Sequence, residues 1–247
     1  MSWDLRCGPW QDTLAGVECD ALIVDAPYSA RTHGGHNLAI DHGAADNARK
    51  GTGRRRIDYD CWDWREIDRF VEEWSHRTRG WFVTITDHVS APTWAESLES
   101  CGRYVFAPIP WVASGGGVRL SGDGPASWTC WIVVARPRDR RFMGWGALPG
   151  AYLIKKDRGS HIGGKPAALM RALVRDYTRP GDLVCDPCAG GGTTLLAAVQ
   201  EGRRAIGSEM DPETHAKAVE RLERKLAQSD LWAACERVKA AEQTDLL

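Results

Sequence analysis

The sequence has 247 residues, 43% of them hydrophobic and 26% charged, which excludes a disordered or fibrous chain and suits one domain over residues 1–247. Its 32 basic residues nearly balance 33 acidic ones, so a nucleic acid would have to meet a local basic patch rather than a global field. The longest apolar run, residues 128–135, is too short to span a bilayer, and no signal pattern opens the sequence, so we expect a cytoplasmic protein with no membrane partner.

The first half of the chain alternates strand and helix patterns. Residues 21–24 read as a strand that is stopped by Pro27. Residues 29–60 are polar, rich in Gly, His and Arg, and without a period, which predicts a long surface loop inserted after that strand. Further along, the patterns predict helices at residues 64–76 and 93–101 and extended segments at residues 81–85 and 104–112.

The second half contains a strand, helix and strand in close succession. Residues 128–135 form a continuous apolar, β-branched run, as expected of a buried strand. The remaining patterns predict a helix at residues 166–177, a strand at 182–185, a glycine turn at 189–193, a helix at 194–200, a strand at 205–209 and a final helix from residue 211. This alternation predicts an α/β protein.

Three glycines, Gly190 to Gly192, stand where a predicted strand turns into a helix. Small-molecule cofactors bind at such turns, and glycine lets the backbone approach them closely. Glu209 ends the next strand, about twenty residues further on, where an acid typically accepts hydrogen bonds from ribose hydroxyls. Because the glycine spacing differs from the dinucleotide pattern, these features predict an adenosine-containing ligand without naming it.

Three segments together resemble the motifs of the amino-group DNA methyltransferases. Asp186-Pro187-Cys188-Ala189-Gly190-Gly191-Gly192-Thr193-Thr194 resembles their cofactor motif Asp-Pro-Phe-x-Gly-x-Gly-Thr-Thr. Asp25-Ala26-Pro27-Tyr28 resembles their catalytic motif Asp-Pro-Pro-Tyr, and His161 with Lys165-Pro166 resembles their His-Pro-x-x-Lys-Pro element. The catalytic motif comes first in the chain, which is the order of the permuted, beta-type members.

The resemblance implies a Rossmann-like α/β fold, with a mainly parallel sheet covered by helices on both faces, and S-adenosylmethionine as cofactor. It also implies transfer of a methyl group to the exocyclic amine of a base flipped out of DNA. The residues that it assigns to cofactor binding are Asp186, Pro187, Cys188, Ala189, Gly190, Gly192, Thr193, Glu209, Lys165 and Pro166. For Lys165 the family contact is largely through the backbone, so a solvated side chain remains the alternative.

The resemblance gives the catalytic motif a chemical role. The carboxylate of Asp25 and a backbone carbonyl accept the two N–H groups of the amine, and Tyr28 stacks on the base. Ala26 stands where proline is usual, but Pro27 still restricts Ala26 to extended geometry. Another departure is Gly8-Pro9, where the family commonly has Gly-Asp against the adenine of the cofactor.

Several alternatives remain open at this stage. Aspartate at the first motif position favours adenine N6, with cytosine N4 as the alternative. RNA or a protein glutamine is a substrate of relatives with the same fold, and a catalytically silent nucleic-acid-binding module is a further alternative. The recognition sequence, a homodimer, and a role in restriction-modification, phage protection or regulation are not decided by the sequence.

Other side chains receive a structural or surface interpretation. Arg54, Arg55 and Arg56 belong to the densest basic cluster and are expected to bind DNA phosphates. Cys185 and Cys188 are expected to be buried filler rather than a redox or metal pair. His33, His36, His42 and Cys61 are irregularly spaced in the loop, so no metal site is predicted.

Overall fold

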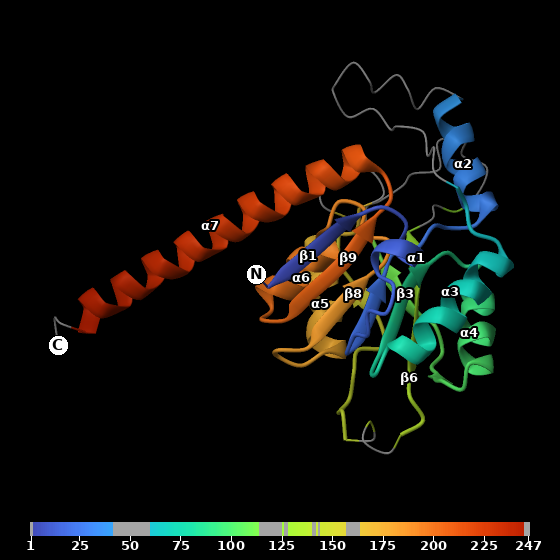
Figure 1. Cartoon of the computed structure of the whole chain (residues 1–247), viewed down its shortest axis with the longest axis horizontal. Coiled ribbons are helices and arrows are strands. Elements are labelled where there is room, and N and C mark those ends of the chain that lie inside the picture. Colours follow the sequence, from blue (N-terminus) through green and yellow to red (C-terminus); the bar gives the residue numbers. More distant parts are fainter. Residues whose placement is uncertain are drawn as a thin grey trace.

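The structure is a computed structural model that describes residues 2–41, 60–113, 125, 128–139, 142, 144–156 and 164–244; the side chains of residues 36–41 and 229–244 are not among those described. A single sheet forms its centre, with helices packed on both faces (Figure 1).

The strands and helices have the following bounds. The strands are β1 (Trp3–Cys7), β2 (Ala21–Val24), β3 (Phe82–Thr86), β4 (Tyr104–Val105), β5 (Ile109–Val112), β6 (Thr129–Arg136), β7 (Tyr152–Leu153), β8 (Leu183–Asp186) and β9 (Arg204–Glu209). The helices are α1 (Trp10–Thr13), α2 (Ala30–Asp41), α3 (Trp64–Arg77), α4 (Ala91–Ser100), α5 (Ala167–Tyr177), α6 (Thr193–Gln200) and α7 (Pro212–Thr244).

The order of the strands across the sheet brings the motifs together. It runs β1-β9-β8-β2-β3-β6-β5-β7, with β4 paired to β6. From β1 to β3 every pairing is parallel, so these five strands end at the same edge. β6 runs antiparallel to both β3 and β5. The prediction of a mainly parallel α/β sheet is confirmed, and β2 and β8, which precede the catalytic and cofactor motifs, are direct neighbours.

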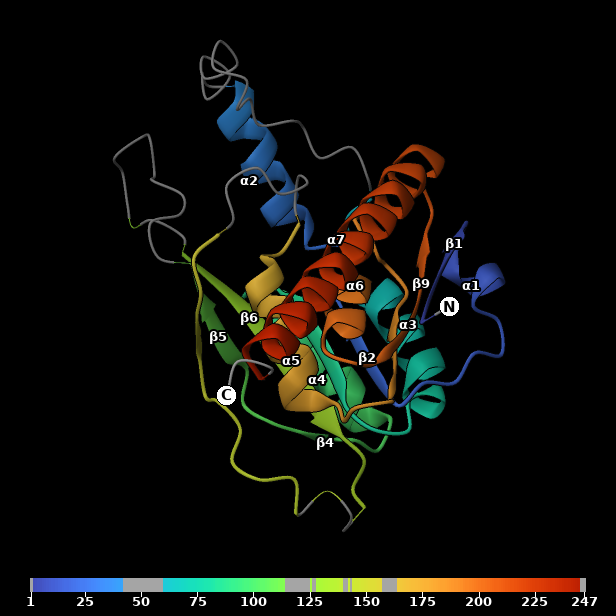
Figure 2. The same cartoon turned by 90° about the vertical axis from the view of Figure 1, so that its left-hand side faces the viewer.

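Helices cover both faces of the sheet, as predicted. On one face α3 and α4 bury Phe70, Trp74 and Trp94 against β2 and β3. On the other face α5, α6 and the first turns of α7 bury Leu173, Leu195 and their neighbours (Figure 2). Because both faces are covered, the central strands are apolar throughout: all four residues of β2 are buried. The far part of α7 extends away from these layers (Figure 1).

The sequence pattern predicts no element before residue 21, yet β1 and α1 lie there. β1 is an edge strand paired with β9, and it buries Leu5 between two charged residues, the exposed Asp4 and the half-buried Arg6. This alternation has the strand period of two, so the signal was present but short. α1 has only four residues and no buried side chain, which leaves no helical period to read.

The prediction of a surface loop over residues 29–60 is wrong for its first third, which forms α2. The helix contains Gly34 and Gly35 and has no apolar stripe, so propensity argues against it. Its first turn is instead held by tertiary contacts at Ser29 and Thr32, described below. The other predicted elements agree with the structure within a few residues at their ends, except that residues 104–112 split into two short strands.

Candidate active site

The carboxyl ends of β2, β8 and β9 place three acidic side chains along one edge of the sheet. Asp25 directly follows β2, Asp186 ends β8 and Glu209 ends β9. β8 lies between the other two strands and pairs with both. The catalytic and cofactor motifs, about 160 residues apart in sequence, therefore meet at the edge where parallel sheets bind ligands.

A hydrogen bond attaches the glycine turn between β8 and α6 to the side chain of Glu209. The backbone N–H of Gly190 donates to Glu209 Oε2 over 2.9 Å, and the N–H of Asp211 donates to Oε1 over 2.9 Å. Gly190 and Gly192 have φ of 50° and 71°, which favours glycine at both positions. A Cβ on Gly190 would meet no protein atom within 4 Å, so the turn faces open space. Each carboxylate oxygen has two lone pairs, so Glu209 retains acceptor capacity for a ligand hydroxyl.

Asp186 is the buried acid of this edge, with 2% of its surface exposed. Burial raises the pKa of Asp186 to about 7, hydrogen bonds from Thr194 and the Cys188 N–H oppose the rise, and the nearby charges of Asp25 and Glu209 add to it. A cation placed among the three carboxylates is therefore favourable. The open turn, the ribose-type acceptor and this acidic cluster fit a ligand that carries both an adenosine and a positive charge, as S-adenosylmethionine does.

The remaining predicted cofactor residues surround the same turn. Pro187, Ala189 and Thr193 are buried, and Cys188 is half-buried with its N–H donating to Asp186 Oδ1 over 3.1 Å. Cys185 is fully buried in β8. The interpretation of the two cysteines as packing residues thus agrees with their burial.

Lys165 is not the solvated side chain that the sequence left as an alternative. It is 9% exposed, and its Nζ donates to both oxygens of Asp25, over 2.6 Å to Oδ1 and 2.5 Å to Oδ2. The same Nζ lies 4.9 Å from the centre of the Tyr28 ring. Pro166 follows as the N-cap of α5. The element that the resemblance placed beside the cofactor therefore also contacts the catalytic motif through its side chain.

The Tyr28 side chain is half-buried, and its buried hydroxyl has no hydrogen-bond partner among the residues that the structure describes. Burial raises the pKa of Tyr28 well above its usual range, and the charge of Asp25 adds to the effect. The tyrosine is thus a neutral apolar ring beside the carboxylate. The Tyr28 carbonyl accepts the N–H of Trp62 over 3.2 Å, so the chain that leaves the sheet after Ser29 returns to the same place at the start of α3.

Asp87, which the sequence analysis did not single out, fastens the catalytic turn to β3. Its Oδ2 accepts from Ser29 N, Ser29 Oγ and Thr32 Oγ1 at 3.1, 2.6 and 2.5 Å, and Oδ1 accepts from Ser90 N at 2.8 Å. Burial alone would raise the pKa of Asp87, but the hydrogen bonds outweigh it and the pKa is lowered. The signal in the sequence that could have identified Asp87 is its position directly after the buried strand β3.

The turn after β1 also lies at this edge, beside Glu209. The Gly8 N–H donates to the Glu209 carbonyl over 2.9 Å, and Ser208 Oγ donates to the Gly8 carbonyl over 2.6 Å. Thr13 Oγ1 and Ser208 Oγ are 2.8 Å apart, which anchors α1 to the same strand. Although Pro9 replaces the usual acid, the backbone of this turn is positioned next to the predicted cofactor site.

Some predicted residues are not placed by the structure. Arg54, Arg55 and Arg56 lie outside the described residues, as do His42 and His161, and the side chain of His36 is not described. Within the described part of the chain, no group of three or more His, Cys, Asp and Glu residues has metal-binding geometry. No helix of that part is both long and apolar enough to cross a membrane.

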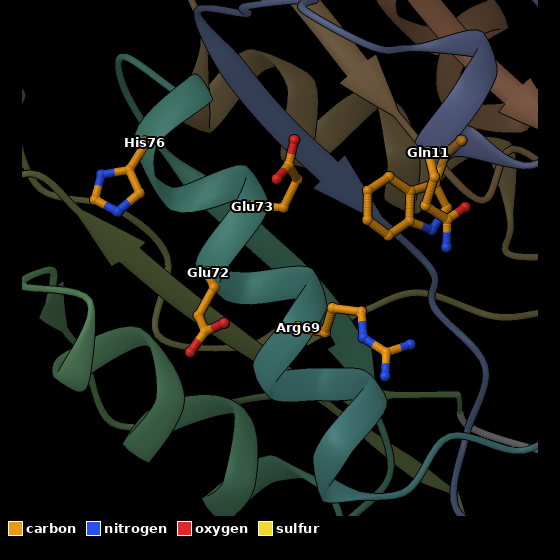
Figure 3. Close-up of a pocket in the computed structure, with 6 residues that line it drawn as sticks. Gln11, Arg69, Glu72, Glu73 and His76 are labelled. Atoms are coloured by element: carbon orange, nitrogen blue, oxygen red, sulfur yellow. The ribbon is translucent and has the colours of Figure 1, made fainter.

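A separate hollow of about 640 Å³ lies between α1 and α3 (Figure 3). It is lined by Trp10, Gln11, Arg69, Glu72, Glu73 and His76. Figure 3 shows Arg69 and Glu73 on the side of α3 that faces α1. None of the motif residues contributes to this hollow, so the motif chemistry indicates the sheet edge rather than the hollow as the active site.

Comparison with known proteins identifies relatives of this chain. A family model described as DNA methylase (N6/N4 type) matches residues 131–220. The putative methylase YubD of Escherichia coli (strain K12) is 37% identical over 219 residues, which cover 85% of this chain and 84% of that protein. The type II methyltransferase M.HindIII of Haemophilus influenzae is 40% identical over 82 residues, 31% of this chain and only 26% of that protein.

The fold also has relatives among solved structures. The M1.HpyAVI–SAM complex superposes with a TM-score of 0.64 at 19% sequence identity, over 89% of this chain and 99% of that one. At this identity the likeness concerns the fold alone, which confirms the Rossmann-like class predicted from the sequence.

Proposed function

Because the chain belongs to the N6/N4 DNA methylase family, as an S-adenosylmethionine-dependent DNA amino-methyltransferase, we propose that it methylates N6 of adenine, with Asp25 and Tyr28 as the groups that receive the base. The observation that carries this assignment is the position of Asp25. Asp25 directly follows β2, which pairs with β8, the strand that leads into the glycine turn, and β8 in turn pairs with β9, which Glu209 ends.

The chemistry required of Asp25 is to orient a poor nucleophile. The lone pair of an exocyclic amine is delocalised into the ring, and hydrogen bonds from its N–H groups to Asp25 and to a backbone carbonyl of the turn direct that lone pair toward the methyl donor. Ala26 offers such a carbonyl, with Pro27 restricting its backbone to extended geometry. When bound, S-adenosylmethionine supplies an electrophilic methyl group.

The cofactor is proposed to lie over the glycine turn. Glu209 would accept hydrogen bonds from the ribose hydroxyls, and Gly190 and Gly192 would allow close approach of the ligand to the backbone. Asp186, Pro187, Cys188, Ala189 and Thr193 form the floor and wall of that site, with Lys165 and Pro166 between it and Asp25. Tyr28 would stack on the base, which has to leave the duplex to reach this edge.

The test uses Asp25→Asn, which preserves shape and removes the charge. Transfer of labelled methyl groups to DNA should fall by at least a hundredfold, while the affinity for S-adenosylhomocysteine, measured by calorimetry, should stay within about twofold of wild type. Equal loss of transfer and of S-adenosylhomocysteine binding would place Asp25 in the cofactor site instead.

The choice of adenine is tested by the product. DNA methylated by the purified protein is digested to nucleosides and analysed by mass spectrometry, with N6-methyladenine as the expected product. Both bases present a ring-conjugated amine that fits an Asp25-plus-carbonyl acceptor pair, so physical chemistry separates them weakly. Predominant N4-methylcytosine would show that the substrate is cytosine and not adenine, and it would leave the roles of Asp25 and Glu209 unchanged.

A further inference from the structure

One of the three carboxylates at the active-site edge, that of Asp25, is paired with a positively charged side chain. In the part of the chain that the structure describes, the side chain of Lys165 forms an ion pair with Asp25, contacting both carboxylate oxygens. The lysine is 9% exposed and the Asp25 side chain 24%, so the pair lies mostly out of water. Asp186 and Glu209 contribute negative charge close by, since the charges of Asp25 and Glu209 both raise the pKa of Asp186.

This ion pair involves the atoms that the reaction needs. The substrate amine has to donate to a carboxylate oxygen of Asp25, and both oxygens are already accepting from Lys165. A carboxylate has about four lone-pair sites, so the ammonium can keep one oxygen while the amine takes the other. A mostly buried charge without a partner would be costly, so the lysine also serves as the partner of the carboxylate and fixes its position while no base is bound.

We propose, on the basis of the function assigned above, that Lys165 is a positioning residue that holds the Asp25 carboxylate ready for the substrate amine and balances its charge. Because the Asp25–Lys165 pair is neutral overall, Asp25 does not act as the counter-ion of the cofactor sulfonium. That role is left to Asp186 and Glu209, and Asp25 remains available to the base.

The two forms of the cofactor provide a direct readout of this charge balance. S-adenosylmethionine carries a positive sulfonium, whereas S-adenosylhomocysteine has a neutral sulfur and otherwise nearly the same shape. The ratio of their affinities therefore reports the charge around the sulfur and cancels effects of packing that act on both. Removal of a positive charge within roughly 12 Å changes such a ratio by about tenfold at an effective dielectric constant near 20.

The experiment measures both affinities by calorimetry at pH 8 for the full-length wild type and four variants. Lys165→Met should raise the preference for S-adenosylmethionine about tenfold, and Asp25→Asn should lower it by a similar factor. The double variant removes both charges, so its ratio should return to within about twofold of wild type. Arg79→Met is the matched control, because Arg79 forms an ion pair with Asp20 near the opposite edge of the sheet, and its ratio should not change.

Transfer kinetics give the second readout. Lys165→Met should lower kcat at least tenfold without raising KM for S-adenosylmethionine, and Lys165→Arg, which keeps the charge, should recover part of the loss in kcat. The proposal is overturned if Lys165→Met weakens both ligands equally, if the double variant keeps the ratio of either single variant, or if kcat is unaffected.

Separate controls cover a variant that fails to fold and a failure of the proposed function. If Lys165→Met does not fold, the double variant and Lys165→Gln, whose amide still donates to Asp25, carry the same comparison of the two ligands. The affinity ratio needs no methyl acceptor. A wild-type protein that transfers nothing to DNA would therefore contradict the proposed function, while the ratios would still support or overturn the role of Lys165.

Discussion

The N–H of Gly190 donates a hydrogen bond to the carboxylate of Glu209 over 2.9 Å, which joins the glycine turn to the end of the neighbouring strand. The second carboxylate oxygen holds the N–H of Asp211, whose own side chain accepts the Thr214 N–H at 2.7 Å in the first turn of α7. Glu209 therefore fixes both chain segments that border the proposed ribose site.

Replacing Glu209 tests this arrangement. Glu209→Ala removes the acceptor for the ribose hydroxyls and leaves the Gly190 N–H without its partner, so the affinity for S-adenosylhomocysteine should fall at least tenfold, or about 1.4 kcal/mol. Calorimetry measures the loss. Glu201→Ala is the control, because Glu201 forms an ion pair with Arg171 after α6, away from the turn. Unchanged affinity in Glu209→Ala would move the cofactor elsewhere.

Asp87 is expected to support catalysis without binding the cofactor. Asp87→Asn retains the volume but loses a charge that accepts from Ser29 and Thr32, and hydrogen bonds to a charged group contribute about 1.5–3 kcal/mol each. The turn after Tyr28 should loosen, so kcat should fall about tenfold while S-adenosylhomocysteine affinity changes less than twofold. Asp182→Asn, which removes a carboxylate that accepts the Arg179 N–H before β8, should leave kcat unchanged. Equal effects of the two substitutions would argue against a specific role.

Asp186 should make the stability of the protein depend on pH. Because the pKa of Asp186 in the folded protein is about 7, above its ordinary value of 3.8, the folded state retains a proton that the unfolded state has lost. Its contribution to stability is complete below about pH 4 and is lost as the pH rises through 7, on the order of 4 kcal/mol in all. Urea unfolding at pH 5 and pH 8 should show a smaller decrease for Asp186→Asn than for wild type. Identical decreases would contradict the prediction.

The basic cluster at Arg54 to Arg56 is predicted from the sequence to bind DNA phosphates. The segment that carries it leaves the sheet after Ser29 and returns at Trp62, which bonds to the Tyr28 carbonyl, so both its ends lie at the catalytic turn. Replacing the three arginines by glutamine should weaken DNA binding and reduce the slope of log affinity against log salt by up to about 3. The same triple change at Arg171, Arg175 and Arg179 in and after α5 is the control. If the replacement of Arg54, Arg55 and Arg56 leaves the slope unchanged, these arginines do not belong to the DNA interface.

The sequence was sufficient where function and local pattern coincide. The sequence predicts that Asp25 and Tyr28 follow a strand, because Pro27 stops it, and that Gly190 occupies a strand-to-helix turn, because glycine allows the backbone conformation of such a turn. Both placements agree with the structure. The mainly parallel sheet could also be predicted, since strands buried on both faces, such as β2, are apolar throughout.

What the sequence could not provide are contacts between segments far apart in the chain. The Lys165–Asp25 pair joins residues 140 positions apart, and α2 forms despite two glycines because Asp87, 58 positions after Ser29, fixes its first turn. Neither of these contacts produces a periodic pattern in the sequence. β1 was overlooked because five residues are too few to establish its alternation.

The pairing of β1 with β9 makes completion of the active site a late event in protein synthesis. Gly8 and Ser208, whose hydrogen bond joins the two strands, are 200 residues apart. A ribosome adding about 5–20 residues per second needs roughly 10–40 seconds to cover that interval. For that time β9, the strand with which β1 pairs, has not been made. A nascent chain stalled before β9 should therefore leave β1 accessible to chaperones and proteases.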